Sequence, residues 1–540
     1  MKLGELVPTA APLVWRLMRS TGGSMTIPAI VFFTALMGVG GLAIDMQRVY
    51  GVHGQMQAYV DNVALAAAAE LDGQTGALVR AFRAAHGDVN HGPLVTGTQN
   101  FATDTSLSVL RVTFLSALGT DPGAIGATPA PGDVVLCTWE NNAWTPANCS
   151  TDITIIRTSN FVEVRAVPRT VSYLVLPVAD VIGQMMGAAP LTNSATVQLR
   201  ATAGYRQQIC NNIPLMVCNP TEATGGSGAA FVPVPGQMMR ATIQTSNLAP
   251  GDFAVINALS GNGANDVRDA YARVNPNTFC VSSVTVKGGA NQGPVQQGLN
   301  VRMDWYLGTL GGGGGGFTTN AEYAPAPDVT KGLKPGNGQN GACNPTQSAQ
   351  TMPFPRDNCF MLAPTPGAGT GCVNVGGTPK MGDTNWARNE YWNLNHKNPT
   401  TLVVDPQPLN YATMSRYQVY RYEVEHPQPI INHDEQSAPA CYSNVASPPT
   451  TDIDHDRRVL IAAVLNCVAD GNKLNGNTPV PAKIYAKLFM TEPAGNTAWD
   501  NFAQGGVKFG PTANQDIFVE MIDIVPPNNT VLHVFPTLYR

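Results

Sequence analysis

Charge is scarce in this sequence of 540 residues: Asp, Glu, Lys and Arg make up 13% of it, and the formal net charge is −5. Globular domains typically carry about 25% charged residues. No run of Lys and Arg is longer than two residues. A nucleic-acid partner calls for a concentrated basic patch that faces the phosphates, so this composition argues against such a partner.

Catalytic motifs are also missing. The sequence contains no P-loop, no HExxH and no GxSxG, which are the patterns that announce phosphate binding, zinc hydrolysis and a nucleophile elbow. No nucleophile stands beside a recognisable base and orienting group. We therefore expect neither an enzyme nor a small-molecule substrate, and we assign no catalytic residue, no cofactor and no bound metal.

Three short polar stretches are candidates for cation sites. The stretch DTSLS (104–108) fits the Asp-x-Ser-x-Ser pattern of a metal-dependent adhesion site. That pattern needs a buried apolar strand before the aspartate, whereas GTQNFAT precedes it here. The stretches IDHDRR (453–458) and INHDEQ (431–436) offer hard-metal ligands. A polar turn is the interpretation that the sequence favours for all three.

No cysteine precedes residue 137, and no CxxC occurs. An even number of cysteines, all on one side of a candidate membrane segment, indicates disulfides formed in an oxidising compartment. The disulfide candidates are Cys137, Cys149, Cys210, Cys218, Cys280, Cys343, Cys359, Cys372, Cys441 and Cys467.

The spacing of the cysteines along the chain indicates which pairs are expected to form disulfides. Cys137–Cys149 and Cys441–Cys467 are the preferred pairs, because each closes a short segment. Cys210 and Cys218 permit either a local bridge or two separate ones. Cys343, Cys359 and Cys372 are expected to bridge among themselves or to Cys280.

Near the N-terminus, the residues from Met25 to Ile44 carry no charge. As a helix they would rise about 30 Å, which is the hydrocarbon thickness of a bilayer. A signal peptide has a shorter core and a small-residue cleavage site, whereas this run ends at Asp45. Lys2, Arg16 and Arg19 precede it, so the positive-inside rule places the N-terminus in the cytoplasm. We predict a retained single-pass anchor.

A helical pattern continues beyond this run. Apolar or packing residues recur at alternating spacings of three and four, which traces one stripe of an α-helix. The stripe consists of Met46, Val49, His53, Met56, Val60, Val63 and Ala67. We predict one long helix from about Met25 to Leu71, whose first half lies in lipid and whose second half is amphipathic.

The block GGLAIDMQRVYGVHGQMQAYVDNVALAAAAEL resembles the anchor of TadE/TadG-like proteins of Flp (Tad, tight-adherence) pilus assembly. In that family a glycine-rich apolar run ends in Gly-[Ile/Leu]-Ala-[Val/Ile]-Asp and leads to Asp-x-Ala-Leu-Ala-Ala-Ala. Val63 is a departure, since it falls between Asp61 and Ala64. The matching residues are Gly41, Leu42, Ala43, Ile44, Asp45, Arg48, Tyr50, Gln55, Gln57, Asp61, Ala64, Leu65, Ala66, Ala67 and Ala68.

Two later segments are similar to larger members of the same family. The stretch ICNNIPLMVCNP begins at residue 209. The C-terminal stretches RRVLIAAVLNC and FMTEP supply the motif residues Arg457, Arg458, Cys467, Glu492 and Pro493.

The resemblance implies a membrane-anchored structural or accessory component of Flp (Tad) pilus assembly in the bacterial inner membrane. Its bulk would be periplasmic, and its partners would be the membrane and other pilus-assembly or pilin proteins. A surface-displayed adhesin or minor pilin-like subunit is the alternative. Pilin-type cleavage after Gly23 would put Pro28 where a pilin has glutamate, which disfavours incorporation by the usual pilin route.

The remaining chain is mostly strand-like, with period-two alternation in stretches such as TVQLRATAGY (196–205). The predicted fold class is α+β: a long N-terminal helix, transmembrane and then amphipathic, followed by a β-rich, disulfide-bonded extracytoplasmic region. The predicted parts are a cytoplasmic tail (1–24), a transmembrane helix (25–44), a periplasmic helix extension (45–72), a first β-rich unit (73–205), a loop-rich Gly/Pro/Asn region (206–400) and a C-terminal β-rich unit (401–540).

Overall fold

The structure is a computed structural model of the chain, and it divides into two compact units. Unit 1 consists of Met1–Tyr205 and Pro536–Arg540, and unit 2 of Arg206–Phe535. The residues described are 26–73, 75–86, 109–119, 132–177, 192–226, 228–259, 263–289, 291–306, 319–328, 332–334, 346–347, 351–398, 400–426, 441–442, 456–475, 478–482, 484–495, 503–510, 515–525 and 532–539, with single positions between them.

Unit 1 begins with one long helix, as predicted. Helix α2 (Thr26–Ala69) has 44 residues, and the chain turns at Gly73, whose φ is 74°. Met56, Val60 and Val63 of the predicted stripe are buried. A second helix, α3 (Ala77–His86), packs against α2.

The buried face differs from the prediction towards the N-terminal end of α2. Met46 and His53 are exposed there, whereas Gly41, Asp45 and Val52 are buried. An apolar pattern misses this face because two of its members are a glycine and a carboxylate.

Within the part of the chain that the structure describes, no helix has an apolar stretch long enough to cross a membrane. The predicted transmembrane segment, residues 25–44, is therefore not supported there. The predicted cytoplasmic tail, residues 1–24, lies outside the described residues, as do Met25 and several side chains between residues 26 and 37.

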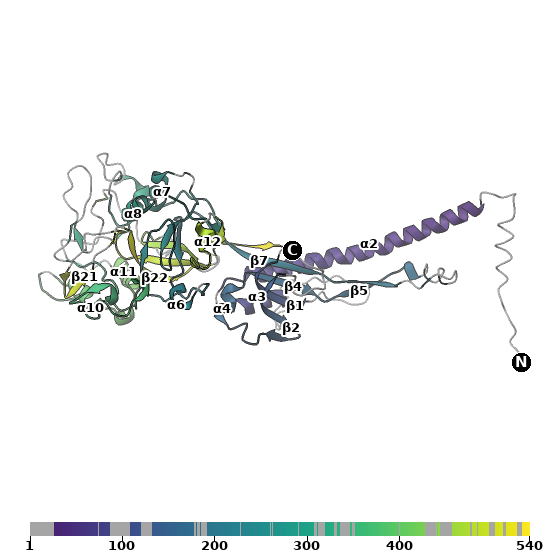
Figure 1. Cartoon of the computed structure of the whole chain (residues 1–540), viewed down its shortest axis with the longest axis horizontal. Coiled ribbons are helices and arrows are strands. Elements are labelled where there is room, and N and C mark those ends of the chain that lie inside the picture. Colours follow the sequence, from purple (N-terminus) through teal and green to yellow (C-terminus); the bar gives the residue numbers. More distant parts are fainter. Residues whose placement is uncertain are drawn as a thin grey trace. The chain divides into compact units, whose positions relative to one another are not determined.

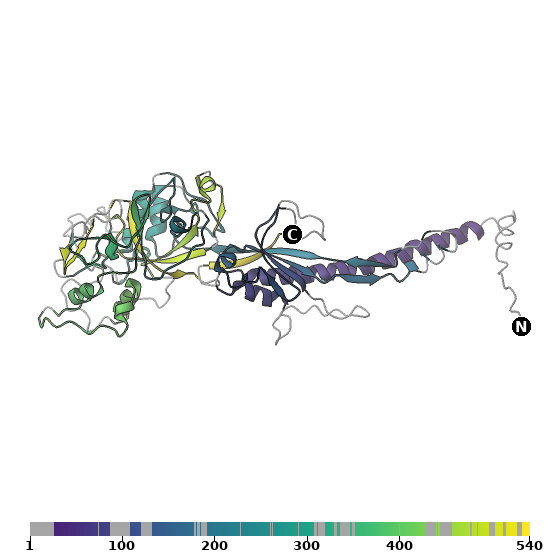
Figure 2. The ribbon, with the colours of Figure 1, turned by 60° about the horizontal axis from the view of Figure 1, so that its bottom comes forward.

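A six-stranded sheet packs on α2 in unit 1, and the two views in Figures 1 and 2 show the helix running on past it. Hydrophobic residues of β4 and β7, such as Val162, Val164 and Ala201, lie against the helix in one core. The strand order is β23 (Leu532–Leu538), β7 (Arg200–Ile209), β4 (Phe161–Ala166), β1 (Val109–Ala117), β2 (Val134–Glu140) and β3 (Ala143–Thr145).

A two-stranded ribbon leaves this sheet and follows α2 (Figures 1 and 2). It consists of β5 (Arg169–Ser172) and β6 (Ser194–Val197), which pair antiparallel. The short helix α4 (Ile153–Thr158) lies between β3 and β4 in the chain and is capped by the Asp152 side chain. The ribbon is what brings the segment after Ser172 to the N-terminal half of α2.

Unit 2 is built on an eight-stranded sheet. The β8–β17 pair is parallel and the other neighbours are antiparallel. Three adjacent strands from segment 401–540 lie between strands from segment 206–400, so these two segments share one sheet. The order is β10 (Phe253–Val255), β8 (Leu215–Cys218), β17 (Val459–Leu465), β19 (Ile484–Met490), β22 (Asp516–Ile524), β9 (Met238–Thr242), β16 (Thr378–Met381) and β15 (Val373–Val375).

Both faces of this sheet are covered, which explains why β17 reads as a continuous apolar run. Leu460 and Ala462 face a core shared with α7 (Ala264–Ala272) and α8 (Gln292–Val301). Ile461 and Ala463 face a second core on the other side. The other helices in the described part of unit 2 are α6 (Glu222–Gly225), α10 (Arg388–Asn395), α11 (Arg416–Glu425) and α12 (Gly471–Asn475).

Short strand pairs and single turns complete unit 2. The paired strands are β11 (Ser283–Val284) with β18 (Val480–Pro481), β12 (Leu333–Lys334) with β13 (Thr346–Gln347), and β21 (Val507–Phe509) with both β14 (Met361–Leu362) and β20 (Ala503–Gln504). The 3-10 turns are η2 (Ala321–Tyr323), η3 (Asn358–Phe360) and η4 (Tyr411–Thr413).

The disulfides confirm part of the predicted pairing. Cys137 bonds to Cys149, as predicted, and Cys359 to Cys372. Cys210 and Cys218 form two separate bridges, to Cys280 and Cys467 respectively. No described cysteine is free, and Cys441 is also disulfide-bonded.

The predicted Cys441–Cys467 pair is wrong. Cys467 bonds to Cys218, whose Cα lies 5.3 Å from its own. Cys218 ends β8 and Cys467 follows β17, and these neighbouring parallel strands bring the two residues together across 249 positions of sequence. Closeness in sequence is a poor guide where a sheet joins distant strands.

Candidate functional site

The Gly-Leu-Ala-Ile-Asp motif at the end of the apolar run contacts another part of unit 1. The Asp45 carboxylate accepts hydrogen bonds from the backbone N–H groups of Leu174, Val175 and Leu176, at 2.7, 2.9 and 2.8 Å. Three consecutive backbone donors therefore point at one carboxylate. Asp45 is only 1% exposed to solvent. This arrangement satisfies a buried charge with oriented backbone dipoles.

Two further residues of the motif complete the site. A Cβ added to Gly41 would lie 2.3 Å from Cγ1 of Val175, so only glycine lets the loop approach the helix this closely. One turn beyond Asp45, the Arg48 Nη1 donates to the Ser172 carbonyl oxygen at 3.2 Å. Gly41, Asp45 and Arg48 lie on one face because helical neighbours recur every three to four residues.

The pKa of Asp45 follows from these contacts. Loss of hydration by itself would raise the pKa of the carboxyl group. The hydrogen bonds from the Leu174, Leu176 and Val175 amides, helped by the charge of Arg48, lower it, and the net pKa is below the ordinary value. The contact therefore favours an ionised Asp45.

The other helix residues of the motif support packing. Ala64 is fully buried and Leu65 half-buried in the core between α2 and the sheet. Asp61 accepts a hydrogen bond from Gln57 Nε2 at 2.6 Å, within the same helix. Ala43 is exposed, on the side of α2 away from Asp45.

In unit 2, the Arg457 side chain donates hydrogen bonds to backbone carbonyl groups, including that of the last residue of a helix. Its guanidinium donates to the carbonyl oxygens of Ala272, Arg273 and Ala324, at 2.5, 2.7 and 2.8 Å. Ala272 is the last residue of α7, so this cation lies where the helix dipole is negative. Burial, together with the nearby Arg302 charge, lowers the pKa of Arg457. Its role in this geometry is structural.

Arg458, Glu492, Cys467 and Pro493 are buried as well. Arg458 donates to the carbonyl oxygens of Met490 and Thr491 at 3.0 and 3.1 Å. Glu492 receives two hydrogen bonds from the Arg356 guanidinium, at 2.7 and 2.9 Å. The C-terminal motif residues thus stabilise the interior of unit 2 and present no reactive group to solvent.

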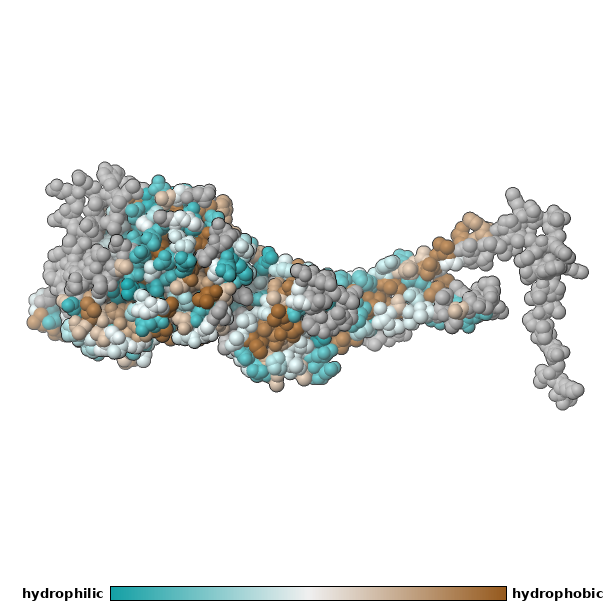
Figure 3. Space-filling view, viewed as in Figure 1, coloured by the Kyte–Doolittle hydropathy of each residue, from teal (hydrophilic) through white to brown (hydrophobic). Residues whose placement is uncertain are grey.

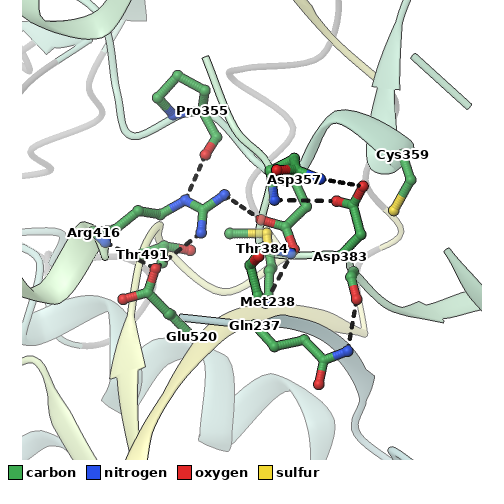
Figure 4. Close-up of polar contacts among 12 residues, drawn as sticks. Gln237, Met238, Pro355, Asp357, Cys359, Asp383, Thr384, Arg416, Thr491 and Glu520 are labelled. Carbon is green, nitrogen blue, oxygen red and sulfur yellow. Dashed lines mark hydrogen bonds and ion pairs between the residues drawn. The ribbon is translucent and has the colours of Figure 1, made fainter. Parts of the chain in front are cut away.

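A buried charge cluster of unit 2 surrounds Arg416 (Figure 4). Its guanidinium lies between two carboxylates, with Nη2 2.6 Å from Asp357 Oδ1 and Nη1 2.9 Å from Glu520 Oε2. Asp357 also accepts from the amides of Met238 and Thr384. No pattern in the sequence joins these residues, because they come from segments more than fifty positions apart.

Glu520 also faces the first amides of helix α11. It accepts from the backbone N–H groups of Arg416 and Tyr417 at 2.9 and 2.8 Å. Burial raises the pKa of Glu520, while Arg416 and these two amides oppose that rise. No side chain of this cluster is exposed to solvent: this holds for Arg416, Asp357 and Glu520. A substrate therefore cannot reach these charges.

Among the described residues, no group of His, Cys, Asp and Glu has the arrangement to hold a metal ion. The stretches 104–108 and 431–436 lie outside the described residues, as do Asp454 and His455. Asp456 is described, and its carboxylate accepts from the Arg458 amide at 2.9 Å. A second buried group, His396 with Glu423 at 2.9 Å, is likewise fully enclosed.

These features define a protein with a long N-terminal helix, whose motif is held by a loop, and with disulfide bonds in both compact units. Residues 23–70 match the family model described as "Putative Flp pilus-assembly TadE/G-like". The match spans α2 and includes the whole Asp45 face. No curated protein and no solved structure matches the chain. The family match indicates a role related to pilus assembly and association with the cell envelope, and nothing in the described residues positively indicates an enzymatic activity.

Proposed function

We propose that this chain is a membrane-anchored structural component of Flp (Tad) pilus assembly, with α2 as the anchor and the two disulfide-bonded units outside the inner membrane. The observation that carries the proposal is that the family match falls on α2, and that the motif residues Gly41, Asp45 and Arg48 fix this helix to unit 1. In this scheme the helix is both anchor and mechanical link.

The exposed side chains of α2 support the anchor. Large apolar side chains remain uncovered on its N-terminal half, where a soluble helix would present polar ones. Phe32, Phe33 and Val39 are 63%, 60% and 70% exposed. In the proposed topology the N-terminus is cytoplasmic, because Lys2, Arg16 and Arg19 precede the run.

The disulfides and buried ion pairs support a mechanical role. Bridges such as Cys218–Cys467 persist in an oxidising compartment such as the periplasm. Enclosed, hydrogen-bonded charges such as the Arg416 cluster hold a core in one arrangement. A rigid unit on a firmly attached helix can hold pilin or other assembly proteins at the membrane.

The test compares Val60→Asp with Asn62→Asp in cells that make Flp pili. Val60 is fully buried in the core between α2 and the sheet of unit 1, whereas Asn62 is exposed on the same helix. Burying one valine contributes about 1.5–3 kcal/mol, and a buried carboxylate costs more. We expect Val60→Asp to reduce the number of surface pili while the chain stays in the membrane fraction, and Asn62→Asp to leave both unchanged.

Equal pilus numbers in both variants would overturn the proposed link between helix packing and assembly. Recovery of the unaltered chain in the soluble periplasmic fraction would overturn the anchor. If deletion of the chain left pili normal in number but the cells unable to adhere, the surface-displayed adhesin would be the better description.

A further inference from the structure

The loop that holds Asp45 also carries an exposed leucine. Leu174 gives its amide to the Asp45 carboxylate at 2.7 Å, yet the residue is 66% exposed. The three amide contacts to Asp45 hold the backbone at Leu174 in place. The exposed leucine side chain is therefore presented from a fixed point of the loop.

The surface of α2 beside this loop is apolar as well. Successive helix residues lie about 100° apart, so Leu42 and Ile44 flank the Gly41–Asp45 face on its two sides. They are 46% and 50% exposed. Leu174, whose amide donates to Asp45, adds a third exposed apolar residue at this contact. Figure 3 shows further hydrophobic residues along α2.

Charged residues begin at the same point along α2. No Asp, Glu, Lys or Arg occurs between residues 26 and 44, and the first carboxylate, that of Asp45, is enclosed by amides. Arg48 and Tyr50 follow within the next turns, and Tyr50 is 69% exposed. Arg and Tyr are typical of the layer where a membrane meets water.

We propose that Leu42, Ile44 and Leu174 form one surface that enters the outer boundary of a phospholipid bilayer, so that the loop after β5 makes a second membrane contact beside α2. This proposal rests on the proposed function of α2 as an anchor. The amides that cover Asp45 allow it, because a bare carboxylate at this depth would keep the loop in water.

A lipid surface fits better than a protein partner. A partner helix would cover one stripe and leave the opposite face polar. Here the exposed apolar residues upstream of Asp45, from Phe32 to Ile44, spread around about half of the helix or more. Only a surrounding medium can cover groups that point in so many directions.

The experiment places a reporter at Leu174. The full chain is reconstituted into vesicles of phosphatidylethanolamine and phosphatidylglycerol whose acyl chains are partly brominated. Leu174→Trp is compared with Leu402→Trp, since Leu402 is similarly exposed at 63% but belongs to unit 2. The emission of the seven native tryptophans is subtracted with the unaltered chain.

We expect the tryptophan at 174 to emit at shorter wavelength and to lose emission to the brominated lipid, and the one at 402 to respond only to acrylamide in water. Quenching of both by acrylamide alone, in chains that float with the vesicles, would overturn the proposal. Shielding of position 174 from both quenchers would assign the surface to a protein, such as a second copy, and also overturn it. Failure of the unaltered chain to float would instead overturn the proposed anchor.

Discussion

The Asp45 carboxylate and the Leu174 amide are joined by a 2.7 Å hydrogen bond across 129 positions of sequence. This bond and its two neighbours are among the contacts through which the motif of the long helix meets the rest of unit 1. These hydrogen bonds explain why an aspartate stands at the end of the apolar run. It is a charged acceptor for a loop, in a position where a hydrophobic residue would leave three amides without partners.

Removing this acceptor should free the loop. We expect Asp45→Ala to speed amide hydrogen exchange at Leu174, Val175 and Leu176, because hydrogen bonds to a charged acceptor typically contribute about 1.5–3 kcal/mol. Hydrogen-exchange mass spectrometry of peptides that cover 172–177 measures it. Asp61→Ala is the matched control on the same helix, since Asp61 accepts only from Gln57 among the contacts described. Equal effects of the two variants would contradict this account.

The same contact should weaken in acid. The folded-state pKa of Asp45 lies below its ordinary value, which for an unfolded aspartate is about 3.9. The stabilisation is therefore present above the unfolded-state pKa and is lost as the pH falls through the folded-state pKa. We expect the difference in protection between the native chain and Asp45→Asn to be constant near neutrality and to shrink in acid. A difference that grew on acidification would show that the sign is wrong.

Gly41 should not accept a side chain. The Cβ of Gly41→Ala would meet Val175 Cγ1 at 2.3 Å, so the loop must move away and its amides should exchange faster. Gly51→Ala is the control, since its Cβ meets nothing within 4 Å, and it should stabilise the helix by up to about 1 kcal/mol. Adding Val175→Ala to Gly41→Ala should restore part of the protection. Absence of any restoration would mean that the clash lies elsewhere.

Breaking the enclosed ion pairs of unit 2 should be costly. Glu520→Ala leaves the Arg416 guanidinium without one of its two carboxylates and two α11 amides without an acceptor. Loss of one partner of a buried pair typically costs about 3–5 kcal/mol. Urea unfolding should show this as a lower midpoint. Asp470→Ala, which removes the exposed Lys473 pair, should change stability by no more than about 1 kcal/mol.

The longest described bridge should matter most in unit 2. Cys218–Cys467 closes 249 positions of sequence, and the chain-entropy model assigns such a loop about 5 kcal/mol. We expect Cys218→Ser with Cys467→Ser to destabilise unit 2 more than Cys359→Ser with Cys372→Ser, whose loop closes 13 positions. A non-reducing peptide map should link Cys218 to Cys467. A map that links Cys441 to Cys467 would contradict the structure.

The long helix, the main strands and the motif could be predicted from the amino-acid sequence alone. Periodicity placed the buried stripe Met56, Val60 and Val63, because the packing of a regular helix follows from its own repeat. The resemblance of the α2 block agrees with the family match at residues 23–70. The Cys137–Cys149 bridge could be predicted because both cysteines lie within one local segment.

The contacts of the motif residues follow from the three-dimensional fold and could not be predicted from the sequence. The partner of Asp45 is a run of backbone amides, and amides carry no sequence signature. Cys467 bonds to Cys218 because β8 and β17 are neighbours in the sheet, and Arg416 meets Glu520 because β22 lies beneath α11. Local pattern fixes the elements through repeats of a few residues, whereas these contacts depend on strand order and crossing connections, which no local repeat encodes.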